Sequence, residues 1–156
     1  MSSDGQGLEV DGAVRALLLL MPRMVGRVKR IPIPEELQSL SLAPRHLSLL
    51  SYLLFDGAMT VNELAERLEV APATVSLMVS ELSRKGLLAR EEDDADRRRR
   101  IVSITDRHLP AIKEWLAQGA TAWQSALAPL TPVERRLFVD TLRAYESAVS
   151  GESTPG

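Results

Sequence analysis

The sequence predicts a mainly α-helical protein that contains one short β-hairpin. Over most of the chain apolar residues recur at steps of three and four, which is the periodicity of amphipathic helices. The period changes only at residues 87–91 and 100–105, two short segments that contain Ile101, Val102 and Ile104. They flank a charged loop and are typical of two antiparallel strands with their tip at residues 93–97. A chain of 156 residues, 45% of them hydrophobic, is long enough for one domain, expected over residues 8–150.

Composition excludes several classes of function. The chain has no cysteine and two histidines, which argues against disulfides, thiolate chemistry and a metal site. No catalytic triad, paired carboxylates or phosphate-binding glycine loop is present, so we expect neither an enzyme nor a cofactor. No apolar run is long enough to span a membrane and no signal peptide is visible, which favours a cytoplasmic protein without a membrane partner. The net charge of −2 gives no general attraction to polyanions.

The first helix is expected within residues 8–30, where one apolar stripe is interrupted by Pro22. A proline inside a helix removes a hydrogen bond, so Pro22 should kink or divide it. Residues 31–34 (Ile-Pro-Ile-Pro) end the helix. The polar ends of the chain, residues 1–7 and 151–156, should be disordered.

Three helices are expected before the hairpin. The first begins near Pro44 and runs to Phe55. The second covers residues 61–68, because Thr60 and Glu63 form a capping box at its start. The third begins at Pro72, runs to about Lys85 and is ended by Gly86.

Two further helices follow the hairpin, within residues 107–149. The first is long and interrupted early by Pro110. The second begins at the capping box of Thr131 and Glu134 and ends near Val149.

The helices at residues 61–68 and 72–85, joined by a short turn, suit a helix-turn-helix. Ala65 provides the small side chain needed where they meet. At 100° per residue, one side of the second helix is apolar and the other is small and hydroxylated, which suits the major groove of DNA. Leu77 on that side either touches a thymine methyl group or packs on the hairpin. The alternative is an ordinary helical hairpin with a solvated face. The candidate DNA-binding residues are Pro72, Ala73, Thr74, Ser76, Leu77, Ser80 and Arg84.

The loop of the hairpin separates acidic from basic side chains and ends in four consecutive arginines. Guanidinium groups suit phosphate contacts and a narrow minor groove, and Asp96 is placed to pair with one of them. The hairpin is therefore interpreted as the wing of a winged helix-turn-helix at about residues 42–106. The alternative is a self-neutralised, solvated hairpin tip. The candidate wing residues are Asp96, Arg97, Arg98, Arg99 and Arg100.

These residues resemble the MarR family of winged-helix transcriptional regulators. The family's wing signature is Asp, any residue, Arg, five of any kind, an aliphatic residue and Thr, and this chain has Asp96, Arg98, Ile104 and Thr105 at that spacing. Segments 60–68 and 74–76 are also similar to the family's helices. Two positions depart from the pattern. Glu69 stands where such turns often have glycine, and Leu77 stands where the recognition helix often carries arginine.

The resemblance implies a homodimer, joined through helices at about residues 8–30 and 107–149, that binds a pseudo-palindromic double-stranded operator. The terminal helices carry more apolar surface than a winged unit could cover alone, which agrees with this. Packing inside one subunit is the alternative for the same side chains. The dimer candidates are Leu17, Leu18, Leu137, Leu142 and Tyr145.

The resemblance further implies a repressor of nearby genes that is relieved by a small aromatic or phenolic ligand. Plain core packing is the alternative for the side chains that would bind it. A winged-helix protein-interaction module without operator binding is the alternative function, against which the intact arginine run argues. The candidate ligand-binding residues are Met21, Met24, His46, Leu50 and Trp115.

Overall fold

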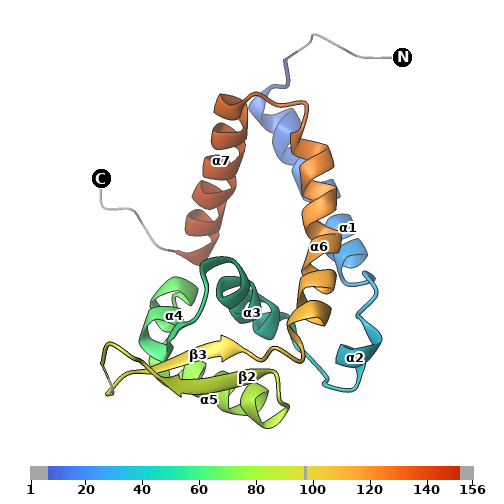
Figure 1. Ribbon diagram of the computed structural model, residues 1–156. Coiled ribbons are helices and arrows are strands. Elements are labelled where there is room, and N and C mark those ends of the chain that lie inside the picture. Colours follow the sequence, from blue (N-terminus) through green and yellow to red (C-terminus); the bar gives the residue numbers. More distant parts are fainter. Residues whose placement is uncertain (1–6, 97, 152–156) are drawn as a thin grey trace. The chain divides into compact units, whose positions relative to one another are not determined.

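The computed structural model describes residues 7–96 and 98–151 and confirms the mainly helical winged helix-turn-helix (Figure 1). The predicted disorder of residues 1–6 and 152–156, and the position of Arg97, lie outside the described residues. The elements, in chain order, are α1 (Val10–Val28), α2 (Glu35–Gln38), α3 (Pro44–Asp56), β1 (Met59–Thr60), α4 (Val61–Leu68), α5 (Pro72–Arg84), β2 (Leu88–Glu92), β3 (Arg100–Ile104), α6 (Leu109–Leu127) and α7 (Pro132–Ser150).

The chain divides into two compact units, one ending at Leu116 and the other beginning at Ala117. The first unit holds the winged helix-turn-helix, and the division falls inside α6. Among the described residues no helix is both long and apolar enough to cross a membrane.

The sheet of the first unit has three strands in the order β1-β3-β2, all antiparallel (Figure 1). The prediction of a two-stranded wing was therefore incomplete. The third strand, β1, has only two residues, and Met59 pairs with Val102 while Thr60 pairs with Ile101. So short a strand has no period of its own, and it forms only because β3 offers its free edge. The strand β1 ends at Thr60, and α4 begins at the next residue, Val61, so the sheet fixes where this helix begins.

The core of the first unit lies between α3, α4, α5 and the sheet. Leu50 of α3, Leu64 of α4, Val79 of α5 and Val102 of β3 are all fully buried. Ala65 is buried where α4 meets α5, which is the close approach that the sequence predicts. The inward side of α5 is also as predicted, and its buried residues are Val75, Met78, Val79 and Leu82.

Three local predictions need correction. Pro22 does not divide helix α1, which runs without interruption from Val10 to Val28, while the alternative of a kink at Pro22 stays a prediction. A single proline removes one hydrogen bond, and the turns on both sides keep theirs. Helix α6 is not interrupted by Pro110 but begins at Leu109, since the first-turn N–H groups have no intrahelical partner to lose. The short helix α2 was not predicted; its single buried side chain, Leu37, joins the core.

The turn between α4 and α5 depends on a left-handed residue. Glu69, at the end of α4, has φ 56° and ψ 42°, a conformation that glycine adopts without penalty. The left-handed conformation of Glu69 makes a short turn possible. In this turn the N–H of the next residue, Val70, donates to the carbonyl of Ala65 at 3.1 Å. The turn is thus a C-cap of the Schellman type with glutamate in the place of glycine.

Replacing Glu69 with glycine should raise the free energy of unfolding by roughly 0.5–1 kcal/mol, because a left-handed L-residue costs about 1–2 kcal/mol and the flexibility of glycine offsets part of that gain. Urea denaturation followed by circular dichroism measures the change. Glu66→Gly is the matched control, three residues earlier within α4. It should lower stability by about 1 kcal/mol. Equal destabilisation by both changes would show that Glu69 is not strained.

The terminal helices are largely exposed. Neither α1 nor α7 has a buried residue. Helix α7 begins as predicted, with Thr131 accepting the N–H of Glu134 at 3.2 Å and the Glu134 carboxylate accepting the N–H of Thr131 at 2.8 Å. Within the second unit, the rings of Trp123 and Phe138 pack with their centroids 5.8 Å apart.

Candidate nucleic-acid interface

The outward face of α5 carries the predicted recognition residues. Pro72, Ala73, Thr74, Ser76, Leu77 and Arg84 are exposed. Leu77 is 71% exposed, which rules out the prediction that it packs on the hairpin and leaves it available to a partner. The side chains before Arg84 on this face are uncharged and short, apart from Leu77, so a groove of DNA would meet little steric resistance.

Ser80 differs from the other residues of this face, because it is half-buried and already has a partner. Its Oγ accepts a hydrogen bond from Nη2 of Arg90, at 3.0 Å. Arg90 lies on β2 and is exposed, so one guanidinium joins the recognition helix to the wing. The sequence analysis did not single out Arg90. Its position in strand β2, outside the arginine run, gave no signal that it faces α5.

The tip of the wing is a tight turn ordered by aspartates. The carboxylate of Asp96 accepts the backbone N–H of Arg98 at 3.0 Å, and the carboxylate of Asp93 accepts the N–H of Ala95 at 3.0 Å. The predicted ion pair between Asp96 and an arginine is absent among the residues the structure describes. The short side chain of Asp96 bonds its own turn instead, as aspartate commonly does. Asp96 therefore shapes the backbone that presents Arg98.

A second carboxylate, that of Glu63 at the start of α4, holds the wing from the side. Its Oε2 accepts the N–H of Thr60 at 2.9 Å, and its Oε1 accepts Nη2 of Arg99 at 2.7 Å. The backbone hydrogen bond from Thr60, followed by the positive charge of Arg99, lowers the pKa of Glu63 despite its partial desolvation. Nε of Arg99 also lies 3.9 Å from Oδ2 of Asp93. The predicted wing residue Arg99 is thus engaged in an exposed ion pair with carboxylates of the protein itself.

The base of the wing is closed by Thr105, the last residue of the wing signature. Its hydroxyl donates to the carbonyl of Gly86 at 2.7 Å, and its N–H donates to the carbonyl of Leu87 at 2.9 Å. Gly86 has φ 78°, so the chain reverses there between α5 and β2. His108 also contacts the Gly86 carbonyl, through Nδ1 at 3.0 Å. The two ends of the hairpin are therefore fixed together.

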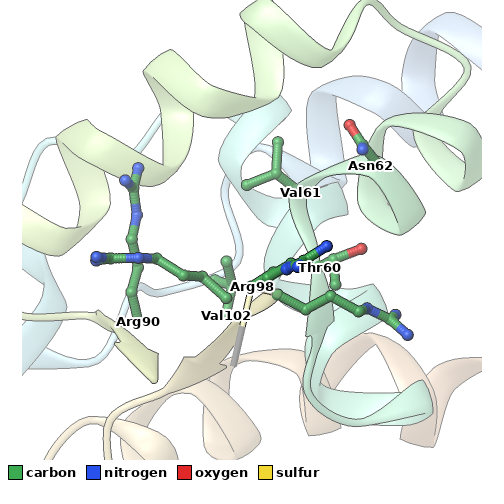
Figure 2. A pocket seen from close by; sticks show the side chains of 8 residues that line it. Thr60, Val61, Asn62, Arg90, Arg98 and Val102 are labelled. Atoms are coloured by element: carbon green, nitrogen blue, oxygen red, sulfur yellow. The ribbon is translucent and has the colours of Figure 1, made fainter. Parts of the chain in front are cut away.

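An open pocket of about 380 Å³ lies between the start of α4 and the wing (Figure 2). Figure 2 shows Arg90 extending from its strand toward the helix above, on one side of this pocket. Four arginines contribute to its wall, so this part of the surface is strongly basic although the whole chain is not. The lining residues are Thr60, Val61, Asn62, Arg90, Arg98, Arg99, Arg100 and Val102.

Comparison of the chain with known proteins identifies its family. A sequence model of the MarR family matches residues 40–99. The chain is 36% identical to the HTH-type transcriptional repressor MdtR of Bacillus subtilis over 104 residues. This aligned region covers 65% of this chain and 67% of that protein. The chain belongs to the MarR family. The resemblance found in the sequence is thereby confirmed, and this protein, like its relatives, is a transcriptional regulator rather than an enzyme.

Solved structures agree with this assignment. The YusO protein from B. subtilis is similar over 90% of this chain and 98% of its own, with a TM-score of 0.54 and 28% identity. BpsR of Bordetella bronchiseptica, whose DNA binding is regulated by 6-hydroxynicotinic acid, is similar over 86% of this chain and 98% of its own, with a TM-score of 0.56 and 25% identity.

The recognition helix of this MarR protein is fastened to α3 by a buried histidine. His46 is 2% exposed, and its Nδ1 accepts the N–H of Ala43 at 3.1 Å. The ring proton is therefore on Nε2, which donates to Oε2 of Glu81 on α5 at 3.2 Å. Arg45 lies 3.6 Å from the same carboxylate. The hydrogen bond from His46 is the largest influence on the pKa of Glu81 and lowers it; desolvation opposes this shift, and the charge of Arg45 adds to it.

The predicted ligand-binding residues lie in different environments. Leu50 is fully buried in the core, and both ring nitrogens of His46 already have partners. Trp115 is partly buried against the core, and on α1 Met21 is half-buried while Met24 is 38% exposed. None of these residues lines the pocket at the wing. Their role in binding a ligand stays a prediction.

Glu81 should make the stability of the protein depend on pH. Because its pKa is lower in the folded protein, its carboxylate stabilises the fold above the pKa of the unfolded state, and this contribution is lost as the pH falls through the folded value. Glu81→Gln should therefore melt at a lower temperature than the wild type at pH 7, and the difference should shrink as the pH falls below the ordinary pKa of a glutamate. Thermal denaturation at several pH values measures it. A constant difference across this range would contradict the assignment.

Proposed function

We propose that this MarR-family protein is a homodimeric repressor that acts in the cytoplasm, binds a pseudo-palindromic operator in double-stranded DNA and releases it when a small aromatic or phenolic ligand binds. The observation that carries the proposal is the position of the arginine-lined pocket beside the exposed, hydroxylated face of α5. A groove-reading helix and a basic wing on one surface are what duplex recognition requires.

The geometry of duplex DNA assigns a role to each part of this surface. If α5 lies in the major groove, with Thr74, Ser76 and Ser80 toward the base edges, the wing reaches the adjacent minor groove, where Arg98 inserts. The phosphate backbone between the two grooves then passes over the space between α5 and β2. A second open pocket lies at this place and is lined by Ser80, Ser83, Arg84 and Arg90, so phosphate contacts are expected from its two arginines.

Charge is concentrated where this mode of binding needs it. Arg98 and Arg100 form no ion pair with any described residue, so their charges are available to DNA. Elsewhere acidic residues are in excess, since the net charge of the whole chain is −2. A low overall charge limits non-specific adhesion while the local cluster supplies affinity, which favours selective over general DNA binding.

The dimer is supported by apolar side chains that the single chain leaves in solvent. On α1, Leu17 and Leu18 are 50% and 67% exposed, and on α7, Leu137 and Tyr145 are 67% and 50% exposed. Leu142, the remaining candidate, is 41% exposed. So much exposed apolar surface is typical of an interface. A two-fold dimer would present two recognition helices to half-sites about one helical turn apart.

Relief by a ligand is supported by BpsR, whose DNA binding is regulated by 6-hydroxynicotinic acid, a small aromatic acid. We propose that Met21, Met24, His46, Leu50 and Trp115 line the corresponding site in this chain. The His46 ring connects that region directly to Glu81 on the recognition helix. A ligand that changes this contact would change the orientation of α5. It would then bind the DNA-binding state and the released state of the protein with different affinity, which regulation requires.

Arg98→Ala should weaken binding to all duplex sequences and lower the slope of log K against log salt by about 1 per subunit, because one phosphate-region contact is lost. Ser76→Ala should instead change the preference at one base position and leave the slope unchanged. Gel shifts and fluorescence anisotropy at several salt concentrations measure both. Equal binding by wild type and Arg98→Ala would overturn the assignment of the wing.

The operator itself is found by selecting bound fragments from the source genome with the wild-type protein. The expected fragments share an inverted repeat and lie next to a promoter. A gel shift on that promoter, repeated with small aromatic acids, tests release. Fragments without any common sequence would overturn specific recognition.

Leu137→Asp should shift the protein from dimer toward monomer, because an aspartate at a buried apolar interface is left unpaired. Sedimentation equilibrium measures the change, expected to be at least tenfold in the dimer dissociation constant. Arg136→Asp is the control, since it places an aspartate at the neighbouring exposed position of α7 and changes the charge even more, by −2 rather than −1. Unchanged dimerisation in the Leu137 variant would place the interface elsewhere.

A further inference from the structure

The three wing arginines that the structure describes, Arg98, Arg99 and Arg100, are not equivalent. Arg99 is held between two carboxylates, with Glu63 at 2.7 Å and Asp93 at 3.9 Å. Arg98 and Arg100 form no ion pair within the described part of the chain. The run of consecutive arginines in the sequence therefore does not reveal that the side chain of Arg99 pairs with carboxylates of the protein itself.

The carboxylate of Glu63 is not free to move away from Arg99. Its second oxygen accepts the N–H of Thr60 and so completes the cap of α4. The hydroxyl of Thr60 in turn accepts the N–H of Glu63 at 3.2 Å. A carboxylate fixed in this way is a rigid acceptor, since withdrawing it would also uncap the helix.

The sheet brings Arg99 to this acceptor. Thr60, the last residue of β1, pairs with Ile101 of β3, and Arg99 lies two residues before Ile101. Arg99 directly precedes β3, and its Nη2 lies 2.7 Å from the carboxylate of Glu63 at the start of α4. The contact between Arg99 and Glu63 thus joins the loop of the wing to the first turn of the helix-turn-helix.

We infer that Arg99 is a positioning residue, whose ion pair with Glu63 fixes the wing against the start of α4 so that Arg98 and Arg100 face the DNA. A guanidinium neutralised by two carboxylates attracts a phosphate weakly, and a phosphate at that place would also meet the charge of Glu63. The pair supplies orientation rather than charge. This inference rests on the proposed function, because it assigns a role within the same DNA-binding surface.

Two substitutions break the pair and leave the cap intact. Glu63→Gln keeps an amide oxygen that accepts the N–H of Thr60 but removes the charge that holds Arg99. Arg99→Ala removes the other partner. Glu66→Gln is the matched control, because it removes the same charge from an exposed position of the same helix.

With a duplex selected by the wild-type protein, Glu63→Gln and Arg99→Ala should each weaken binding by about two- to fivefold per subunit, the range expected for an exposed ion pair. The double variant should be no weaker than either single variant, because both remove the same contact. The salt slope should stay that of the wild type, in contrast to Arg98→Ala. Glu66→Gln should bind as tightly as the wild type or more tightly.

The opposite result is equally clear. If Arg99 contacts DNA, Glu63→Gln will release it and tighten binding beyond the Glu66→Gln control, and Arg99→Ala will lower the salt slope by about 1 per subunit. Either observation overturns the inference.

A measurement without DNA separates this inference from the proposed function. Amide hydrogen exchange in residues 93–104 should be several-fold faster in Glu63→Gln and Arg99→Ala than in the wild type and Glu66→Gln, because the wing loses its lateral anchor. Unchanged exchange overturns the positioning role even if DNA binds. If the wild type selects no duplex while exchange changes as expected, the proposed function fails and the anchoring of the wing stands.

Discussion

The candidate DNA-binding surface of this protein depends on the start of α4. Within four residues the chain pairs with the wing through Thr60, caps a helix through the exchange between Thr60 and Glu63, and holds Arg99 through the same glutamate. A capping box satisfies N–H groups that no helix can satisfy alone. Here its position, directly after a strand, also fixes the distance between the helix-turn-helix and the wing. Sheet, helix and loop therefore share one set of hydrogen bonds.

The recognition helix is fixed from three other directions. Its inward side packs in the core, with Val75 and Val79 fully buried. On α3 the ring of His46 donates to Glu81, and on β2 Arg90 donates to Ser80. One of the two polar contacts joins the helix to α3 and the other joins it to the wing. The outward face is thereby presented in a defined orientation, which specific readout of base edges requires.

The helical elements followed closely from local sequence signals. Capping residues and prolines gave the starts of α4, α5 and α7, and the period of apolar residues gave the buried side of α5. The features that the sequence did not reveal depend on contacts with distant parts of the chain. A two-residue strand such as β1 exists only through β3, and Arg90 is recognised as part of the surface only because β2 lies beside α5.

By itself, the sequence determined the family, the class of fold, and the two segments that form the candidate DNA-binding surface, because helix caps, apolar periodicity and the wing signature are all local patterns. Only the tertiary structure decided how the charges of the wing are divided. The carboxylate of Asp96 accepts a backbone N–H of the loop and pairs with no guanidinium among the described residues, whereas Arg99 pairs with Glu63, which is 36 residues earlier. The physical reason is that an ion pair depends on the distance between two side chains in space. The number of residues between them along the chain does not reveal which side chains the sheet brings close together.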